Sequence, residues 1–309
     1  MGQYKLKIAF VIATKDRPGE LRSLMRNLEE QSHKPDEVIV VDGGNLPVIE
    51  SLRQLSKFPI KYIKFRPPSA ARQRNAGLRA VSPETGLIGF LDDDVILEET
   101  ALERMMAFWD EATPSVVGAG FNMLNHPHLA AAKMKSSPLA ESLGLYGAKK
   151  GRVLRSGFQT MIGEVDKTTE VQWLSTSAAV WRRPVFELYR FDEWFSAYSY
   201  LEDLDFSYKA GKSGRLAVVS DARYFHMTSP SGREGSYAFG QREILNRLYF
   251  VRKHPELSIS RCVLALILRM AMSFFLYVKK GDARFLQRLL GNLAGFRRAL
   301  FQGMTNFSH

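Results

Sequence analysis

Three consecutive carboxylates follow a short apolar run in the first third of the chain. Leu87-Ile88-Gly89-Phe90-Leu91 has the length and composition of a buried strand, and Asp92-Asp93-Asp94 comes directly after it. Because adjacent carboxylates repel one another and hydrate strongly, we expect the strand to end there. Its end then presents a cluster of oxygen ligands that suits a hard divalent cation such as Mg²⁺ or Mn²⁺. The triplet alone is equally well interpreted as an acidic turn before a helix, since carboxylates favour the first helical turn.

Two earlier apolar runs also end in polar turns. The run 7–13 is followed by Thr14-Lys15-Asp16-Arg17-Pro18, and the run 37–41 is followed by Asp42-Gly43-Gly44. Free backbone N–H groups at a strand-to-helix turn form a natural anion site. An aspartate beside a glycine turn can accept a hydrogen bond from a nucleobase or a ribose, while the glycine lets the ligand approach the backbone. Ordinary connecting turns are the alternative for both.

Charged side chains at two predicted helix starts are further candidates. Arg72 and Arg74 lie in the first turn of the helix predicted over 69–78, from which both can reach a diphosphate. Guanidinium groups bind phosphate oxygens in a bidentate fork. Glu202 and Asp203 begin another helix, whose dipole favours ionised carboxylates, and an ionised carboxylate can be a general base. The alternatives are a solvated basic face, which is favoured for an isolated arginine pair, and a charged helix start.

The order of the elements predicts how these residues meet. Strand-like runs lie at 7–13, 37–41, 60–63, 87–91, 116–121, 171–183 and 216–219, with helical patterns between the first four. This alternation predicts an α/β fold with a mostly parallel central sheet flanked by helices, in which ligands bind beyond the carboxyl ends of the strands. Neither the G-x-G-x-x-G nor the G-x-x-x-x-G-K-[ST] phosphate motif is present.

Three further stretches are less specific. His226 lies in a short apolar run, and a lone histidine is more often a packed core residue than a ligand. Residues 122 to about 170 are a candidate acceptor-binding region or an ordinary surface insertion. The stretch 229–236 has the glycine and serine content of a mobile loop.

Length and composition limit the class of protein. With 309 residues, the chain can form one large α/β domain, or one domain with appended helices. Its single cysteine, Cys262, excludes a disulfide framework and a cysteine zinc cluster, which fits a reducing cytoplasm, and the first residues lack the layout of a signal peptide. The net charge of +11 predicts a polyanionic partner. Nucleic acid is disfavoured because no zinc-finger, helix-turn-helix or RNP pattern accompanies the basic residues.

The last fifty residues predict a pair of helices. From Cys262 to Val278 the chain is apolar apart from Arg269 and Ser273. This run is short for a hydrocarbon core of about 30 Å, and a central arginine costs about 2.5–3.5 kcal/mol on insertion, so we expect an interfacial or core-packed helix. Residues 284–300 form a basic amphipathic pattern suited to an anionic surface. Packing on the catalytic domain or on a dimer partner is the alternative.

In this order, the motifs resemble those of family-2 nucleotide-sugar glycosyltransferases with the GT-A (Rossmann-like) fold, over Ile8 to about His254. We therefore expect a catalytic domain over 1–255 and a helical, membrane-associating region over 256–309. The resemblance implies nucleotide- and donor-binding residues at Thr14, Asp16, Arg17, Asp42, Gly43, Arg72, Arg74, Asn75, Asp92 and Asp93. It implies metal ligands at Asp94 and His226, and catalytic residues at Asp203, which is favoured as the base, and Glu202. Within the nucleotide site, Asp42 is implied to bind the base and Asp92 the ribose.

The resemblance also implies a reaction. A hexosyl or deoxyhexosyl group would move, with inversion and with Mn²⁺ or Mg²⁺, from a UDP- or dTDP-linked donor to a glycan or a lipid-linked glycan. Such transfer would take place at the inner face of the cytoplasmic membrane, as in the assembly of bacterial surface glycans. Lys209 stands where the family often has arginine, which loses the bidentate fork. Gln241-Arg242 has no tryptophan after it, so the signature of processive synthases is missing and transfer of a single sugar is favoured.

Two other functions remain open at this point. A nucleotidyltransferase-like enzyme also binds a metal through carboxylates on an α/β fold, but it normally has a glycine-rich N-terminal loop with arginine and lysine, which the stretch 13–18 is not. The other is a non-catalytic membrane-surface module on a degenerate sugar-nucleotide fold.

Overall fold

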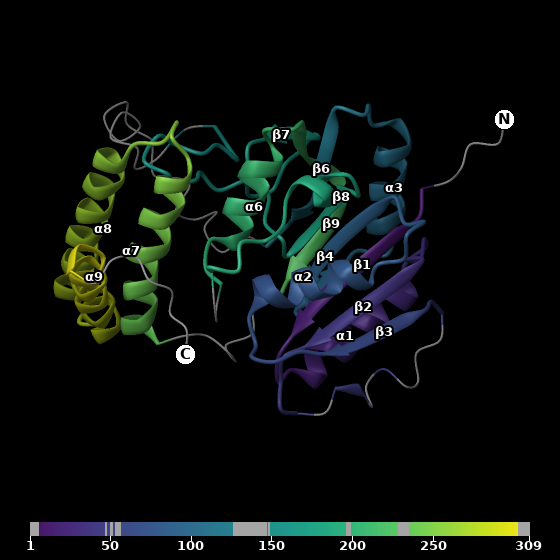
Figure 1. Ribbon diagram of the computed structural model, residues 1–309, viewed down its shortest axis with the longest axis horizontal. Helices are drawn as coiled ribbons and strands as arrows, with labels where there is room; N and C mark the ends of the chain where they lie inside the picture. Colours follow the sequence, from purple (N-terminus) through teal and green to yellow (C-terminus); the bar gives the residue numbers. More distant parts are fainter. Residues whose placement is uncertain are drawn as a thin grey trace. The chain divides into compact units, whose positions relative to one another are not determined.

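The computed structural model describes residues 6–46, 48–49, 52, 57–125, 147, 149–195, 199–227 and 235–301 (Figure 1). Contacts divide the chain into two compact units. Unit 1 comprises Met1–Ala131, Ile162–Glu193 and Glu202–Pro230, and unit 2 comprises Ala132–Met161, Trp194–Leu201 and Ser231–His309. Residues 126–146 and 148 of the candidate acceptor region and 229–234 of the expected loop lie outside the described residues.

Unit 1 is built on one sheet. Its strands are β1 (Ile8–Thr14), β2 (Glu37–Asp42), β3 (Ile60–Lys64), β4 (Leu87–Asp92), β5 (Val95–Leu97), β6 (Val116–Met123), β7 (Thr169–Val171), β8 (Ala178–Arg182) and β9 (Arg215–His226). Over the described residues their order is β3-β2-β1-β4-β8-β6-β9-β5, with β7 paired to β9. The α/β class with a central sheet is confirmed, but the sheet is more mixed than predicted, because β8 runs antiparallel to both of its neighbours and β5 and β7 run antiparallel to β9.

The parallel strands β3, β2, β1 and β4 end together. In register, Thr14 of β1 pairs with Asp42 of β2, which pairs with Lys64 of β3, while Asp92 of β4 pairs with Ala13. Strands β1 and β2 are buried along almost their whole length, because their near-continuous apolar runs are covered on both faces. The prediction that their polar ends share one sheet edge is therefore confirmed.

Helices cover both faces of this sheet (Figure 1). They are α1 (Pro18–Glu30) and α3 (Ala101–Glu111) on one face, and α2 (Ala70–Ala80), α5 (Val185–Leu188) and α6 (Glu202–Ala210) on the other. Neighbouring residues of β1 belong to different cores. Phe10 belongs to the core that contains Leu24 of α1, whereas Val11 belongs to the core on the opposite side, which contains Phe206 of α6. This alternation is the period of two expected of a strand.

Unit 2 contains three long helices that lie side by side in Figure 1. They are α7 (Ser236–Lys253), α8 (Ile259–Lys280) and α9 (Ala283–Phe301). Gly281 adopts a left-handed conformation, with φ of 65°, at the end of α8, so the chain can turn sharply into α9. The expected helical C-terminal region is thus present. The boundary predicted between residues 255 and 256 falls between α7 and α8, which both belong to unit 2, and it stays a prediction.

Candidate active site

The aspartate triplet forms the turn between two strands. Asp92 is the last residue of β4, and Asp93 and Asp94 form a turn that leads into β5. The interpretation of the triplet as an acidic turn before a helix is therefore wrong, because a strand follows. This strand, β5, pairs with β9 so that Val95 lies opposite His226, which brings the histidine to the triplet.

The middle carboxylate of the triplet lies inside the protein. Asp93 is 4% exposed and accepts hydrogen bonds from Thr14 Oγ1 at 2.7 Å and from Arg17 Nη1 at 2.9 Å. Burial raises the pKa of Asp93 to about 6, although both partners act to lower it. Three predicted donor-site residues thus form one cluster, in which Thr14 and Arg17 hold the turn in place.

The outer two carboxylates and the histidine form a candidate metal site. One ligand atom each from Asp92, Asp94 and His226 lies within 4.8 Å of the others. His226 Nε2 is 2.9 Å from Asp94 Oδ1, and Arg17 Nη1 is 3.3 Å from Asp94 Oδ2. Two carboxylates and an imidazole are a ligand set that fits Mn²⁺, and carboxylates also fit Mg²⁺. The structure adds Asp92 to the pair predicted from the sequence.

Arg74 links this group to the predicted catalytic base motif. Its Nη2 donates to Asp92 Oδ1 at 3.0 Å and its Nη1 donates to Glu202 Oε1 at 2.7 Å. The guanidinium group is buried, and its carbon lies 5.6 Å from the centre of the Phe191 ring. Arg74 was expected to face the diphosphate. In the structure it instead forms ion pairs with two carboxylates that are 110 residues apart in the sequence.

The two carboxylates at the start of α6 differ in their partners. Burial raises the pKa of Glu202 to about 8, an increase that Asp203 adds to and Arg74 opposes. Burial also raises the pKa of Asp203, while the Leu204 N–H, which donates to its Oδ1 at 2.7 Å, acts to lower it. A carboxylate whose pKa is raised binds a proton more strongly than an ordinary carboxylate does, which suits a group that must accept a proton. Leu201, directly before the pair, has a φ of 76°, so the backbone turns sharply into the helix.

Asp42 is engaged within the protein. It is fully buried, and its oxygens accept hydrogen bonds from the Gly44 N–H at 2.7 Å, from the Tyr62 hydroxyl at 2.8 Å and from Lys64 Nζ at 2.7 Å. Burial, the hydrogen bond and the charge of Asp42 raise the pKa of Tyr62 to about 12. Its expected contact with a nucleobase stays a prediction. In the structure, Asp42 orders the turn that follows β2.

The remaining predicted donor residues have structural partners. Asp16, in a left-handed conformation with φ of 55°, accepts hydrogen bonds from the backbone N–H groups of Asn45 and Leu46. Arg72 Nε lies 3.6 Å from Glu193, and the amide of Asn75 donates to the Phe191 carbonyl at 2.9 Å.

A side chain at Gly43 would collide with its neighbours. An added Cβ would lie 2.8 Å from Pro68 Cβ and 2.9 Å from Gln73 Oε1, so this glycine allows close packing.

Sequence reasoning missed two residues at this edge. Lys64 ends β3 opposite Asp42 and also donates to the Gly44 carbonyl at 2.5 Å. Gln73 is buried and donates to the carbonyls of Thr14 and Val41, which joins α2 to the ends of β1 and β2. The rule that had selected Asp42, a polar residue at the end of a parallel strand, also selects Lys64. For Gln73 the sequence offered no comparable signal.

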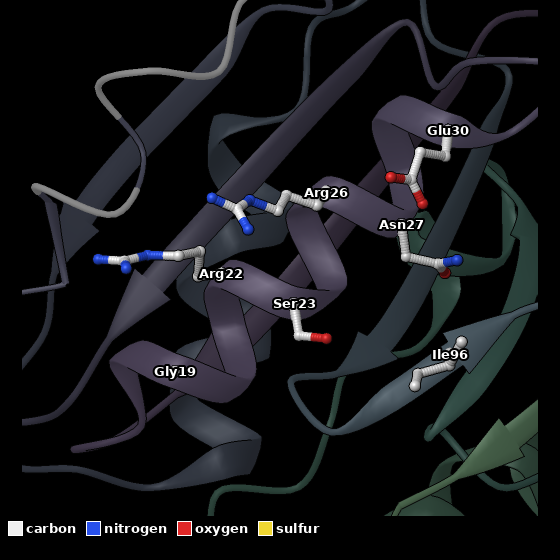
Figure 2. A pocket seen from close by; sticks show the side chains of 7 residues that line it. All are labelled: Gly19, Arg22, Ser23, Arg26, Asn27, Glu30 and Ile96. Atoms are coloured by element: carbon white, nitrogen blue, oxygen red, sulfur yellow. The ribbon is translucent and has the colours of Figure 1, made fainter.

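A pocket of about 400 Å³ lies against α1 and β5 (Figure 2). It is lined by Gly19, Arg22, Ser23, Arg26, Asn27, Glu30 and Ile96. None of the carboxylates of the candidate site lines it. The Asn27 side chain exchanges hydrogen bonds with the backbone of Leu97, which attaches α1 to β5.

Comparison with known proteins agrees with this geometry. Residues 9–148 match the sequence model of Glycosyl transferase family 2. No curated protein gives a significant match. Among solved structures, the crystal structure of S. aureus TarS has a TM-score of 0.51 and 19% identity, covering 80% of this chain but only 42% of that one.

Two further structures match over almost the whole chain. TarS in complex with UDP-GlcNAc has a TM-score of 0.56 and 18% identity, over 97% of this chain and 83% of that one. The mannosyltransferase PcManGT from Pyrobaculum calidifontis, in complex with GDP-Man and Mn²⁺, has a TM-score of 0.57 and 13% identity, over 97% and 88%. At these identities the likeness shows the fold. Residues 9–148 thus carry the sequence pattern of Glycosyl transferase family 2, and the chain as a whole has the fold of these glycosyltransferase structures.

Proposed function

We propose that this glycosyltransferase moves one sugar, with inversion and with a divalent metal, from a nucleoside-diphosphate sugar to a hydroxyl of a glycan or a lipid-linked glycan. The observation that carries the proposal is the position of Arg74 between Asp92 and Glu202. Through this one side chain, the candidate metal ligands and the candidate base motif belong to the same network of ion pairs.

Asp92, Asp94 and His226 would hold Mn²⁺ or Mg²⁺, and the metal would neutralise the charge on the departing nucleoside diphosphate. Arg17 holds Asp93 and Asp94, so the turn that supplies the ligands is ordered from the segment between β1 and α1. The structural neighbour PcManGT was solved with GDP-Man and Mn²⁺, which supports a nucleotide-sugar donor bound with a metal.

Asp203 is our candidate for the base that takes the proton from the acceptor hydroxyl as it attacks the anomeric carbon. Glu202 is tied to Arg74 through an ion pair at 2.7 Å, whereas the hydrogen bonds described for the Asp203 carboxylate come from backbone N–H groups at the start of its own helix. Glu202 therefore positions Arg74, and Asp203 remains available to a substrate.

The nucleoside would bind at the ends of β1, β2 and β3, around Thr14, Asp16, Asp42 and Lys64. TarS structures contain UDP or UDP-GlcNAc, which supports a UDP or a dTDP donor for this chain. Asp42 is held by Tyr62 and Lys64, so a base could reach its carboxylate only if one of these partners moved.

The enzyme would bind its acceptor at the inner face of the cytoplasmic membrane. Of the described helices, α8 is long and apolar enough to cross a membrane, with a mean hydropathy of 1.8 over its most apolar window. The basic amphipathic helix α9 follows it, which supports association with an anionic surface and hence a lipid-linked acceptor.

The decisive experiment is the substitution Asp203→Asn. If Asp203 is the base, turnover falls by about 10²–10⁴-fold. The affinity for the metal and the nucleoside diphosphate, measured by calorimetry, stays nearly unchanged, because the charge removed is not a ligand.

The matched control is Asp110→Asn, the same chemical change at an exposed position of α3. It should leave turnover unchanged. Full turnover of the Asp203→Asn variant would contradict the assignment of the base. Absence of any transfer or donor hydrolysis by the wild-type protein with Mn²⁺ and a panel of nucleotide sugars would contradict the proposed reaction.

A further inference from the structure

Helix α8 is apolar on two opposite sides, and only one side is covered. The side that packs within unit 2 carries Cys262, Ala265, Leu266 and Ser273, all less than 10% exposed. The opposite side carries apolar residues that are 40–66% exposed: Leu264, Ile267, Phe274, Phe275 and Val278. At 3.6 residues per turn these positions form one stripe about half a turn away from the buried set. Contiguous exposed apolar surface of this kind marks an interaction site.

Arg269, near the middle of α8, belongs to the covered side. Its guanidinium carbon lies 4.4 Å from the centre of the Phe158 ring, and that of Arg247 lies 4.2 Å from the same ring. Both arginines belong to unit 2. A bilayer-spanning α8 would have to carry Phe158, Arg247 and the packed faces of α7 and α9 into the hydrocarbon core with it. A helix lying in the plane of the surface leaves all these contacts in place.

The charges around the exposed stripe identify the partner. Residues 259–301 contain eight basic side chains and one acidic side chain, Asp282. Lys279 and Lys280 at the end of α8, and Arg261 at its start, are exposed. A second copy of the chain placed on this stripe would bring like charges together. The negative phosphates of an anionic lipid surface complement them, at about 1 kcal/mol per basic residue near the surface.

We propose that α8 lies flat on an anionic bilayer, with the Leu264–Val278 stripe buried at the level of the headgroups and Arg269 packed against Phe158 on the covered side of the helix. The proposal deepens the membrane association stated above and is independent of the sugar chemistry. It also predicts a monotopic protein, in which no helix described here crosses the bilayer.

The test uses the full-length protein and vesicles of phosphatidylcholine with or without phosphatidylglycerol. The wild-type protein should sediment with the anionic vesicles, much less with the neutral ones, and should be released by high salt or alkaline carbonate. Phe275→Glu should weaken binding about tenfold or more, because it removes the burial of one aromatic side chain and adds a repelled charge. The matched control is Leu188→Glu, the same charge change at a 68% exposed apolar residue of α5, which should bind as the wild type does.

Four results would overturn the proposal. Two concern binding: no binding of the wild-type protein to anionic vesicles, or binding by Phe275→Glu that equals that of the wild type. The other two are wild-type protein that stays on the vesicles after alkaline carbonate, and a wild-type dimer that the Phe275→Glu substitution dissociates. Retention would mean a membrane span, and the dimer would mean that a second copy covers the stripe. Metal-dependent donor binding, measured on the same variants in detergent-free buffer, should not change. A failure of lipid binding is thereby distinguished from a failure of the proposed reaction.

Discussion

At the scale of single residues, the three aspartates of one turn have different surroundings. Asp92 is bound by Arg74, Asp93 is buried against Thr14 and Arg17, and Asp94 contacts His226. The three carboxylates therefore have two different roles. Asp93 holds the turn, whereas Asp92 and Asp94 can bind a metal together with His226. Arg74 is the link from this turn to α6.

Replacing Arg74 should destabilise the fold. Arg74→Met leaves Asp92 and Glu202 without their shared cation, and breaking a buried ion pair costs about 3–5 kcal/mol. We expect the lower end of this range, because the Asp92 side chain is 32% exposed. Urea unfolding measures the loss. The double variant Arg74→Met/Glu202→Gln should recover part of it, because no unpaired charge then remains at residue 202. A double variant no more stable than the single one would show that the Glu202 charge is not the cause.

The rate of transfer should fall as the pH is lowered. A base must be ionised, and burial raises the pKa of Asp203 above its ordinary value of 3.8, so activity is lost as the pH falls through that raised value. The measurement is kcat/KM against pH with saturating metal. In Glu202→Gln, kcat/KM should still decrease as the pH is lowered. The residual kcat/KM of Asp203→Asn should lack this decrease. If kcat/KM of Asp203→Asn decreased at low pH as it does in the wild type, a group other than Asp203 would be responsible for the pH dependence.

At the scale of elements, glycines allow α7 and α9 to pack very closely. Gly240 of α7 faces Gly291 of α9, and the Asn292 side chain donates to the Gly240 carbonyl at 2.9 Å. Gly295 of α9 lies against Gln241 and Ile244 of α7. Buried polar groups lie beside this contact. Arg288 donates to both carboxylate oxygens of Glu243, and although burial acts to raise the pKa of Glu243, these bonds lower it below its ordinary value. The pairing of α7 with α9 thus depends on small residues and on one ion pair.

Adding a single methyl group should disturb this packing. In Gly291→Ala the new Cβ would lie 2.1 Å from the Tyr237 carbonyl oxygen, and backbone cannot move aside cheaply, so we expect a loss of about 1–3 kcal/mol on unfolding by urea. Gly19→Ala, in α1, is the control. Nothing lies within 4 Å of its Cβ, and this change should be neutral or stabilise by up to about 1 kcal/mol. Equal stability of the two variants would contradict the close packing.

At the scale of the whole molecule, ligand binding should raise thermal stability through residues from distant parts of the chain. The candidate metal ligands lie on β4 and β9 and in the turn before β5, and these strands belong to one sheet. A ligand that binds only the folded state stabilises it by about 2.7 kcal/mol at one hundred times its dissociation constant. Binding at this site should therefore hold the ends of these strands together.

We expect Mn²⁺ with a nucleoside diphosphate to raise the melting temperature, and a chelator to reverse the increase. Asp94→Asn should abolish most of the metal-dependent part, since it removes one of the two carboxylates of the site. The matched variant Asp110→Asn should respond as the wild type does. A metal-dependent shift of full size in Asp94→Asn would remove Asp94 from the site.

The sequence by itself determined the class of fold and the common edge of its first strands. Apolar runs that end in polar residues are local patterns, and parallel strands must align their carboxyl ends, so Thr14, Asp42 and Asp92 could be placed together without coordinates. The tertiary structure alone decided which charged groups pair with one another. Arg74 meets Glu202 across 128 positions and Asp94 meets His226 across 132, and no local periodicity encodes such distances.

The surroundings of α8 and of Asp42 likewise could not be predicted from local sequence patterns. Helix α8 has apolar residues on two opposite sides, so only its contacts with the rest of unit 2 show which side is covered and where Arg269 lies. Asp42 was expected at a ligand, but Tyr62 and Lys64 come from the neighbouring strand and bind its carboxylate. Periodicity fixes which side chains share a face of an element, whereas the packing of elements fixes what each face meets.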